Sequence, residues 1–180
     1  MTTLVVENII ASAVIADKLD INYIAEKIPD FKYNPDEFSG LSIKLDHPKT
    51  AIIILPSGKI ICTGGKNIED VEESIRKIAE RIKGSGVKLK TKTNMEIHNM
   101  IVTTNLNKDL HLSSLSKALI GQKDYEPDKF PGLIYKIEDM QVVILLFSSG
   151  KLVCSGAKNF DDSKKAIEIM KEKLTSVGAL

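Results

Sequence analysis

The stretch LPSGKIICTGGKN at residues 55–67 recurs as FSSGKLVCSGAKN at residues 147–159. The segment YNPDEFSG at 33–40 recurs as YEPDKFPG at 125–132 with the same offset of 92 residues. Aligned without gaps, 33–83 and 125–175 share 18 identical residues in 51 positions. Chance would give roughly three, so the chain is an internal duplication.

Each repeat follows the same plan of strands and helices. Gly58 stands in a turn between two apolar runs, which is a hairpin signal. Asn67 suits a helix cap with Asp70 three residues on, and Gly84 stops the helical periodicity. In the first repeat we expect strands near 4–12 and 40–45 and at 51–55 and 59–63, with helices near 20–28 and at 68–84. In the second repeat we expect strands near 95–103 and at 132–137, 142–147 and 151–155. Its helices are expected near 111–120 and from the Asn159 cap to Gly178.

The order of elements predicts an α+β fold. Strands grouped between helices favour an antiparallel sheet with helices on one face. The repeats are expected to span 1–90 and 91–180. The second repeat begins within about ten residues of the first helix end, so one continuous sheet with a pseudo-twofold axis is more economical than two separate domains.

The bulk composition is that of an ordinary globular protein. The chain has 180 residues, a formal net charge of +1, 43% apolar residues and 27% charged residues. The near-neutral charge argues against nucleic-acid binding by bulk charge, though not against binding by a specific face. Apolar runs fall short of the roughly 18 residues that span a bilayer, so we expect neither a membrane segment nor a signal peptide.

Enzymatic chemistry is not predicted. Cys62 and Cys154 occupy the same repeat position, which indicates a structural role in a strand rather than a redox role. The sequence has no CxxC and its three histidines stand alone, so we expect no metal site and no cofactor. The SGK segments lack the upstream glycine of a P-loop, and no nucleophile–base pair stands out.

The central strands are apolar on both sides. Residues 51–55 and 142–147 show no polar alternation, although a sheet covered by helices on one face should alternate. Two interpretations stay open at this point. The second face is buried within the chain or a dimer, or it is an exposed apolar patch that binds something large and flat.

The chain resembles the TATA-box-binding protein family over essentially its whole length. The resemblance is carried by the duplicated YxPDxFxG and SGKxxCxGxK motifs and by the pair Asn8 and Asn99. It implies a tandem-duplicated saddle, that is, a continuous curved antiparallel sheet with helices on the convex face. It further implies a general transcription initiation factor of the archaeal type that binds the minor groove of TATA-box DNA and kinks it with apolar wedges.

The resemblance also implies site residues. Asn8 and Asn99 would lie near the pseudo-dyad and donate to minor-groove acceptors. The wedge pairs would be Phe38 with Leu55 and Phe130 with Phe147. Family members commonly have Phe-Ser where Leu55-Pro56 stands, which predicts a weaker kink at that end. The other expected DNA-binding residues are Ile10, Ile61, Thr63, Ile101, Val153 and Ser155, and the expected phosphate contacts are Lys44, Lys49, Lys59, Lys66, Lys136, Lys151 and Lys158.

The implied partners are A/T-rich double-stranded promoter DNA, transcription factor B and, indirectly, RNA polymerase. Glu126, Asp128 and Lys129 match the loop that contacts transcription factor B in relatives. The expected location is the cytoplasm, associated with the nucleoid, in an archaeon, or the nucleus in a eukaryote. The alternatives are a protein-interaction or dimerisation module that uses the apolar face, and a divergent paralogue with altered promoter preference.

Overall fold

The structure, a computed structural model, describes residues 3–180. These residues form ten strands, paired antiparallel within each of two groups of five, and four helices, which confirms the predicted α+β class. By their contacts they divide into two compact units. We call residues 8–98 the N-terminal unit and residues 99–180, with the start of β1, the C-terminal unit. The predicted repeat boundary at 90/91 is a boundary in sequence and stays a prediction.

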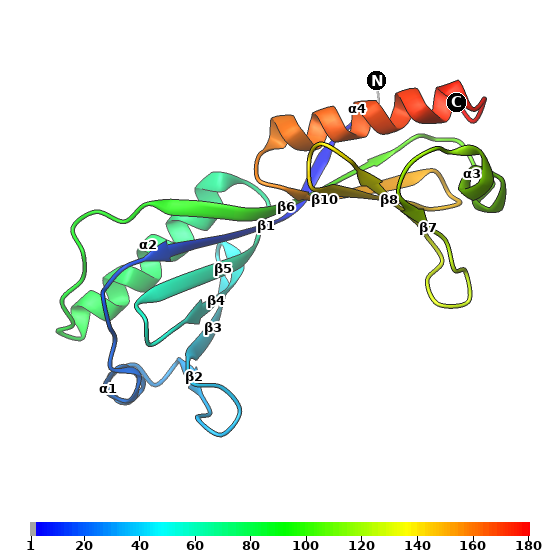
Figure 1. The fold of residues 1–180 in the computed structure, drawn as a ribbon. Helices are drawn as coiled ribbons and strands as arrows, with labels where there is room; N and C mark the ends of the chain where they lie inside the picture. Colours follow the sequence, from blue (N-terminus) through cyan, green and yellow to red (C-terminus); the bar gives the residue numbers. More distant parts are fainter. Residues whose placement is uncertain (1–2) are drawn as a thin grey trace. The chain divides into compact units, whose positions relative to one another are not determined.

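The N-terminal unit is a sheet with one long helix and one short helix. Its strands lie in the order β2-β3-β4-β5-β1, and every pair is antiparallel. In Figure 1 the long helix α2 runs along one face of these strands. The elements are β1 (Val5–Val14), α1 (Ile21–Lys27), β2 (Lys32–Tyr33), β3 (Leu41–Asp46), β4 (Lys49–Ile54), β5 (Lys59–Gly65) and α2 (Ile68–Gly84).

The C-terminal unit repeats this arrangement. Its strands lie in the order β6-β10-β9-β8-β7, again antiparallel, and α4 lies along one face of them (Figure 1). The two-residue strands β2 and β7 were not expected from the sequence, because two residues are too few to show a pattern. The elements are β6 (Met95–Asn105), α3 (Leu112–Ala118), β7 (Lys123–Asp124), β8 (Leu133–Ile137), β9 (Val142–Leu146), β10 (Lys151–Ala157) and α4 (Phe160–Ser176).

Both long helices begin at the predicted asparagine caps. The Asn67 Oδ1 accepts from the backbone N–H of Asp70 at 2.7 Å, and the Asn67 amide donates to the Asp70 carboxylate at 2.8 Å. Asn159 makes the same two bonds with Asp162 at 2.8 and 2.7 Å. Each cap satisfies a backbone donor that a helix start leaves without an intrahelical partner.

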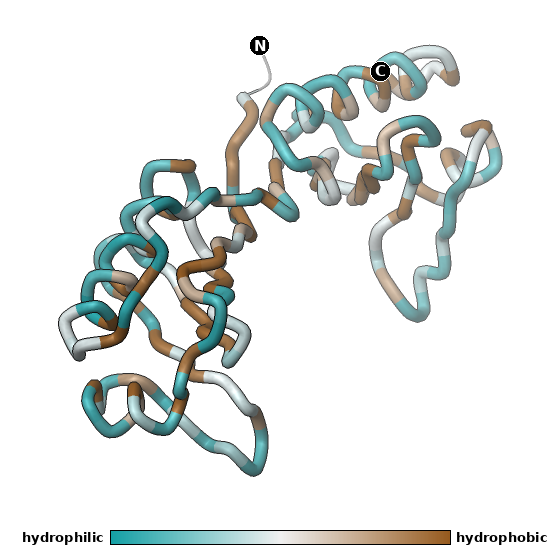
Figure 2. The backbone as a smooth tube through the Cα atoms, turned by 60° about the vertical axis from the view of Figure 1, so that its left-hand side comes forward, coloured by the Kyte–Doolittle hydropathy of each residue, from teal (hydrophilic) through white to brown (hydrophobic). Residues whose placement is uncertain are grey.

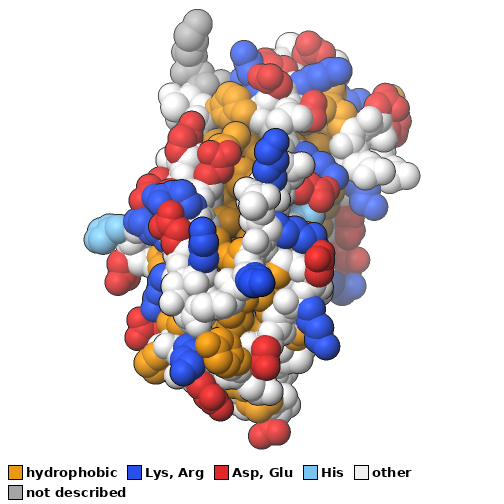
Figure 3. Space-filling view, turned by 90° about the vertical axis from the view of Figure 1, so that its left-hand side faces the viewer, with side chains coloured by type: hydrophobic (Ala, Val, Ile, Leu, Met, Phe, Trp, Pro, Cys, Tyr) orange, Lys and Arg blue, Asp and Glu red, His pale blue; other side chains and the backbone are white. Residues whose placement is uncertain are grey.

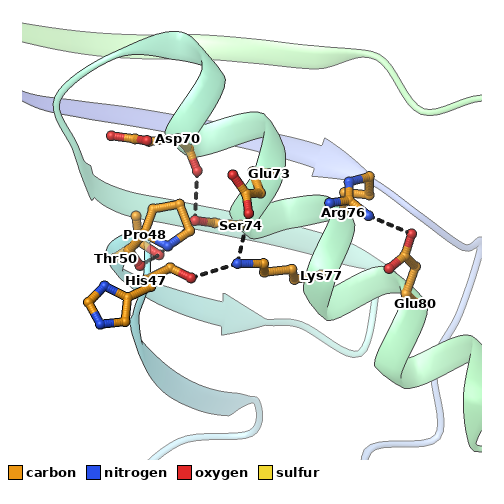
Figure 4. A network of polar contacts seen from close by, with 9 residues as sticks. All are labelled: His47, Pro48, Thr50, Asp70, Glu73, Ser74, Arg76, Lys77 and Glu80. Atoms are coloured by element: carbon orange, nitrogen blue, oxygen red, sulfur yellow. Dashed lines mark hydrogen bonds and ion pairs between the residues drawn. The ribbon is translucent and has the colours of Figure 1, made fainter.

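A polar network ties α2 to the turn between β3 and β4 (Figure 4). The Lys77 ammonium donates to the carbonyl of His47 at 2.7 Å and pairs with Glu73 at the same distance. Beneath it, the Thr50 hydroxyl donates to Ser74 Oγ at 2.9 Å, and Ser74 donates to the carbonyl of Asp70. The buried hydroxyl groups between helix and sheet are therefore all hydrogen-bonded, as buried polar groups must be.

The apolar strands alternate between a buried side and a partly exposed side. In β4, Ile52 and Ile54 are fully buried while Ile53 between them is 36% exposed. Figure 2 shows hydrophobic residues along the strands of each unit and more hydrophilic residues in the loops. The missing polar alternation therefore reflects apolar side chains on both sheet faces, only one of which the helices cover.

Within residues 3–180, no helix combines the length and the apolar character that a membrane crossing would need.

Candidate nucleic-acid interface

The direction of the buried cysteines Cys62 and Cys154 distinguishes the two faces of the sheet in each unit. Cys62 is fully buried, which raises the pKa of its thiol, and the side chain of Ser74 on α2 lowers that pKa in part, so the thiol points toward the helix. Its strand neighbours Ile61 and Thr63 therefore point away from α2. In the C-terminal unit Cys154 is fully buried, which raises the pKa of its thiol, and Ser163 on α4 lowers that pKa in part, so the same alternation applies. We call the sheet surface turned away from α2 or α4 the open face of its unit.

The open face of the N-terminal unit carries an amide and a hydroxyl side by side. Asn8 on β1 and Thr63 on β5 are hydrogen-bonded through Asn8 Nδ2 and Thr63 Oγ1 at 3.1 Å. The Asn8 Oδ1 accepts from the backbone N–H of Gly64 at 2.7 Å. The structure therefore brings together two of the residues that the resemblance implied, in a defined orientation.

The C-terminal unit reproduces this pair with other residues. Asn99 Nδ2 donates to Ser155 Oγ at 3.2 Å, and the Asn99 Oδ1 accepts from the backbone N–H of Gly156 at 2.7 Å. Val153, directly across from Thr103, lies on the same face as Ser155. Each unit thus presents an amide donor and a hydroxyl beside an apolar surface.

The predicted wedge pair of the C-terminal unit is already assembled. The Phe130 and Phe147 rings are 5.8 Å apart at 68°, an edge-to-face contact. The Phe130 N–H bonds the Glu126 carbonyl at 2.9 Å, and the Phe147 N–H bonds Lys151 at 3.0 Å. Both rings therefore stand on hydrogen-bonded turns and are half-buried.

The predicted wedge pair of the N-terminal unit is less aromatic. Phe38 is 42% exposed and stands on a turn in which its N–H bonds the Asn34 carbonyl at 2.9 Å. Leu55 occupies the position of Phe147, and its N–H bonds Lys59 at 2.9 Å. The backbones of the two wedge sites match, and the side chains differ.

Several of the predicted phosphate-binding lysines share the open face. Lys44 lies opposite Ala51, and Ala51 lies opposite Thr63, so all three face the same way. Lys136 lies opposite Val143, which pairs with Ser155, in the C-terminal unit. Lys59 and Lys151 alternate onto the same faces as Ile61 and Val153. The remaining predicted lysines stand at the ends of β4, β5 and β10: Lys49, Lys66 and Lys158.

The predicted partner-binding loop is a tight turn beside Phe130. The Lys129 N–H bonds the Glu126 carbonyl at 2.9 Å, and the Lys129 ammonium pairs with the Glu126 carboxylate. Asp128 is exposed at the same turn. The loop therefore presents charged groups of both signs from a hydrogen-bonded backbone.

Strand alternation adds four residues to the open faces, and two of them, Ser12 and Thr103, are buried there. Ser12 lies opposite Ile61, and its hydroxyl is 2.6 Å from His98 Nε2. Thr103 donates to the Glu7 carboxylate at 2.9 Å. Alternation from Asn8 and Ile10 could have identified Ser12, because every second residue of a strand shares a face. Alternation also places the partly exposed Ile53 and Leu145 on the open faces.

The two cysteine thiols are buried in their units. Burial raises the pKa of the Cys62 and Cys154 thiols to about 11, which leaves them neutral at physiological pH. Residues 3–180 contain no cluster of three or more His, Cys, Asp or Glu side chains that could hold a metal ion. A groove of about 510 Å³ in the N-terminal unit lies between α2 and residues 89–95, on the helix side of the sheet.

Surface charge is mixed. Figure 3, which faces the left-hand side of Figure 1, shows basic and acidic side chains interspersed over apolar atoms. This distribution fits the net charge of +1. A nucleic-acid ligand would therefore have to be held by a particular face and not by an overall basic surface.

We expect the buried thiols of Cys62 and Cys154 to stabilise the fold below pH 9, and we expect this contribution to be lost as the pH rises toward 11. An unfolded thiol ionises near its ordinary pKa of about 9, whereas Cys62 and Cys154 ionise at about 11 in the fold. Ionisation in the unfolded state therefore lowers stability in this window, by up to about 2 kcal/mol per thiol. The urea midpoint of unfolding should decrease more between pH 8.5 and pH 10.5 in the native protein than in the variant Cys62→Ala/Cys154→Ala. Equal losses in both would contradict the expectation.

Each of the two units has one face covered by a long helix and one open apolar face that carries an asparagine. This arrangement defines a tandem-repeat α+β protein. The family model described as "Transcription factor TFIID (or TATA-binding protein, TBP)" matches residues 3–84 and 94–177. The chain belongs to this family of general transcription factors.

Relatives and a solved structure support this assignment. A TATA-box-binding protein of Pyrococcus abyssi is 40% identical over 175 residues, 97% of this chain and 91% of the relative. TATA-box-binding protein D of Halobacterium salinarum is 37% identical over 179 residues, 99% of this chain and 96% of the relative. The structure of the Methanococcus jannaschii TBP matches with a TM-score of 0.89 and 34% identity, covering 96% of this chain and 98% of that one.

Proposed function

We propose that this chain is a general transcription initiation factor that binds the minor groove of TATA-box promoter DNA, kinks it with apolar wedges and recruits transcription factor B and RNA polymerase. The observation that carries the proposal is the open face of each unit. Half-buried apolar side chains such as Ile61 and Val153 surround an asparagine, and lysines share the face. Among the fold's surfaces, this one fits the groove of an A/T-rich duplex.

The chemistry of the minor groove favours A·T pairs on such a face. A·T pairs present only acceptors there, and G·C pairs add the guanine amino donor. The Asn8 and Asn99 amides donate to acceptors, and apolar side chains leave a guanine amino group without a partner. An unpartnered buried donor costs about 1–3 kcal/mol, which disfavours G·C.

Burial of the wedge side chains on DNA would offset the cost of bending the duplex. Bending a site costs about 1–6 kcal/mol by elastic estimates, and fully burying a large apolar side chain gives about 1.5–3 kcal/mol. About half of that gain remains for each half-buried wedge, so burying Phe38, Leu55, Phe130 and Phe147 on DNA would together give about 3–6 kcal/mol, comparable with the bending cost. Flexible TA steps lower that cost further.

A bending assay tests the proposal. The full chain is mixed with an A/T-rich TATA duplex labelled at both ends, and with a G/C-rich control duplex, and the end-to-end distance is followed by energy transfer. Binding and shortening on the A/T-rich duplex alone are expected, with a further mobility shift when transcription factor B is added. Equal weak binding to both duplexes would instead favour the protein-interaction or dimerisation module.

Replacing Leu55 with phenylalanine is expected to sharpen the kink at the end of the site that the N-terminal unit contacts. Leucine is an admissible wedge, but it is smaller than Phe147 and stacks less well on a base. The variant should bind a TATA duplex roughly 3- to 10-fold more tightly, because added apolar burial contributes about 25 cal/mol per Å². Bend angle and affinity measured side by side check this, and unchanged values of both would contradict it.

The salt dependence should reflect a few phosphate contacts. Seven candidate lysines predict a slope of log K against log salt no steeper than about −6, at about −0.9 per contact. Lys59→Gln should make the slope shallower by about one contact, because Lys59 lies on the open face. Lys83→Gln on α2 is the control and should leave the slope unchanged. A slope equally affected by both variants would contradict this assignment of the lysines.

The turn at residues 126–129 is the proposed contact for transcription factor B. Asp128 is exposed and its charge is available to a partner's basic groups. Reversing that charge in Asp128→Lys should weaken the shift caused by transcription factor B and leave the binary complex with DNA intact. Asp161→Lys, at the start of α4, provides a matched charge reversal away from the turn.

A further inference from the structure

Each unit contains a β-bulge next to its open-face asparagine. In the N-terminal unit Ile9 pairs with Gly65 and Ala11 with Cys62, so β5 uses one more residue than β1 over this stretch. In the C-terminal unit Met100 pairs with Ala157 and Val102 with Cys154, which gives the same extra residue in β10. Bulges often re-aim a group beside a functional site.

The bulge places a backbone donor against the asparagine oxygen. Gly64 and Gly156 have φ angles of +101° and +104°, a conformation that favours glycine. A Cβ would lie 3.1 Å from the Lys49 carbonyl oxygen at Gly64, and 2.6 Å from that of Gln141 at Gly156. The glycine N–H donates to Asn8 Oδ1 in one unit and to Asn99 Oδ1 in the other, at 2.7 Å in both.

This hydrogen bond fixes the orientation of the asparagine side-chain amide. A backbone N–H can only donate, so the atom 2.7 Å from it must be the amide oxygen and not the nitrogen. Flipping the Asn8 amide would set its NH₂ group against the Gly64 N–H, two donors facing each other. The Asn8 NH₂ group donates to Thr63 Oγ1 at 3.1 Å, and an NH₂ group carries a second N–H that can donate to another acceptor.

We propose that the bulges at Gly64 and Gly156 are positioning devices that aim the asparagine NH₂ groups, and not their oxygens, at the bases. The inference rests on the proposed function and deepens it. An unpinned asparagine could rotate its oxygen outward and accept from the guanine amino group, and would then tolerate G·C. With the oxygen pinned, the face offers donors only and reads A·T. The duplication of the geometry in both units supports a shared role.

Replacing Asn8 and Asn99 with aspartate changes the outward group from a donor to an acceptor while the side chain keeps its length and position. A carboxylate can still accept from the Gly64 and Gly156 N–H groups, but its outward oxygen is an acceptor. The readout is competition binding to three duplexes whose central pairs are A·T, inosine·C or G·C. Inosine lacks the guanine amino group, so inosine·C resembles A·T in the minor groove. Asn94→Asp, exposed in the segment before β6, controls for the added charge.

The native protein should bind the A·T and inosine·C duplexes alike and at least 10-fold more tightly than the G·C duplex. In Asn8→Asp/Asn99→Asp the added charge should weaken all three complexes, while the preference for A·T over G·C falls at least 10-fold. Asn94→Asp should keep the native preference. A native preference retained by the double variant would overturn the inference.

A second measurement tests the pin without DNA. Amide hydrogen exchange at Gly64 and Gly156 should be slow in the native protein and in the aspartate variant, and at least 10-fold faster in Asn8→Ala/Asn99→Ala. Exchange that is indifferent to the alanine changes would overturn the inference. If the native protein showed no preference for A·T, the proposed function would be wrong. The exchange measurement would still test whether the Gly64 and Gly156 N–H groups are hydrogen-bonded to the asparagine oxygens.

Discussion

Replacing Phe38 with alanine is expected to lower the affinity for an A/T-rich TATA duplex by roughly 10- to 100-fold, with a smaller bend. Phe38 is 42% exposed in the free protein, so a large part of its ring surface can still be buried on DNA. Burying the exposed part of the ring gives about 1 kcal/mol, and stacking of the ring on a base adds about 1–3 kcal/mol, which together account for a loss of this order. Fluorescence anisotropy and energy transfer on the same duplex measure both quantities.

The chain offers a matched control for this prediction. Phe160 at the first position of α4 is 40% exposed, almost the same as Phe38, but it belongs to a helix on the covered side of the sheet. Phe160→Ala should change the affinity by less than about threefold, since it removes the same group from a surface outside the site. Similar losses in Phe38→Ala and Phe160→Ala would mean that general apolar adhesion, and not wedging, holds the complex.

Much of the fold could be predicted because duplication displays each signal twice. Asn67 and Asn159 are caps at equivalent positions, and the structure confirms both. The expected strand near 4–12 is found as Val5–Val14, because Ala13 and Val14 continue the ladder opposite Ile60 and Lys59. Where a strand ends thus depends on its partner strand, which local sequence does not reveal.

The candidate site was less predictable than the fold. The wedge and asparagine positions followed from repeat motifs and the family resemblance, and their role in DNA binding stays a prediction. The bulge could not be foreseen, because Thr63-Gly64-Gly65 reads as an ordinary strand end until its register against β1 is known. The Ser12–His98 contact likewise joins residues 86 positions apart, a separation over which sequence pattern carries no information.

The adjacent residues Ile60 and Ile61 should show opposite effects when either is replaced by alanine. Ile60 is fully buried on the helix side of β5, whereas Ile61 is half-buried on the open face. Removing a buried isoleucine leaves a cavity and costs about 2–5 kcal/mol, so Ile60→Ala should lower the urea midpoint strongly. The DNA affinity of the folded fraction should change little.

Ile61→Ala should do the reverse. The Ile61 side chain already contacts solvent, so we expect the substitution to lower the free energy of unfolding by less than about 1.5 kcal/mol. The substitution also removes apolar surface that the minor groove would cover. A loss of affinity of roughly 5- to 30-fold is expected on the A/T-rich duplex, measured where both variants are folded. The two residues differ only in the direction that one step along a strand imposes. If both variants lost stability equally and neither lost affinity, the open face would be a second core surface, and the proposal for DNA binding would fail with it.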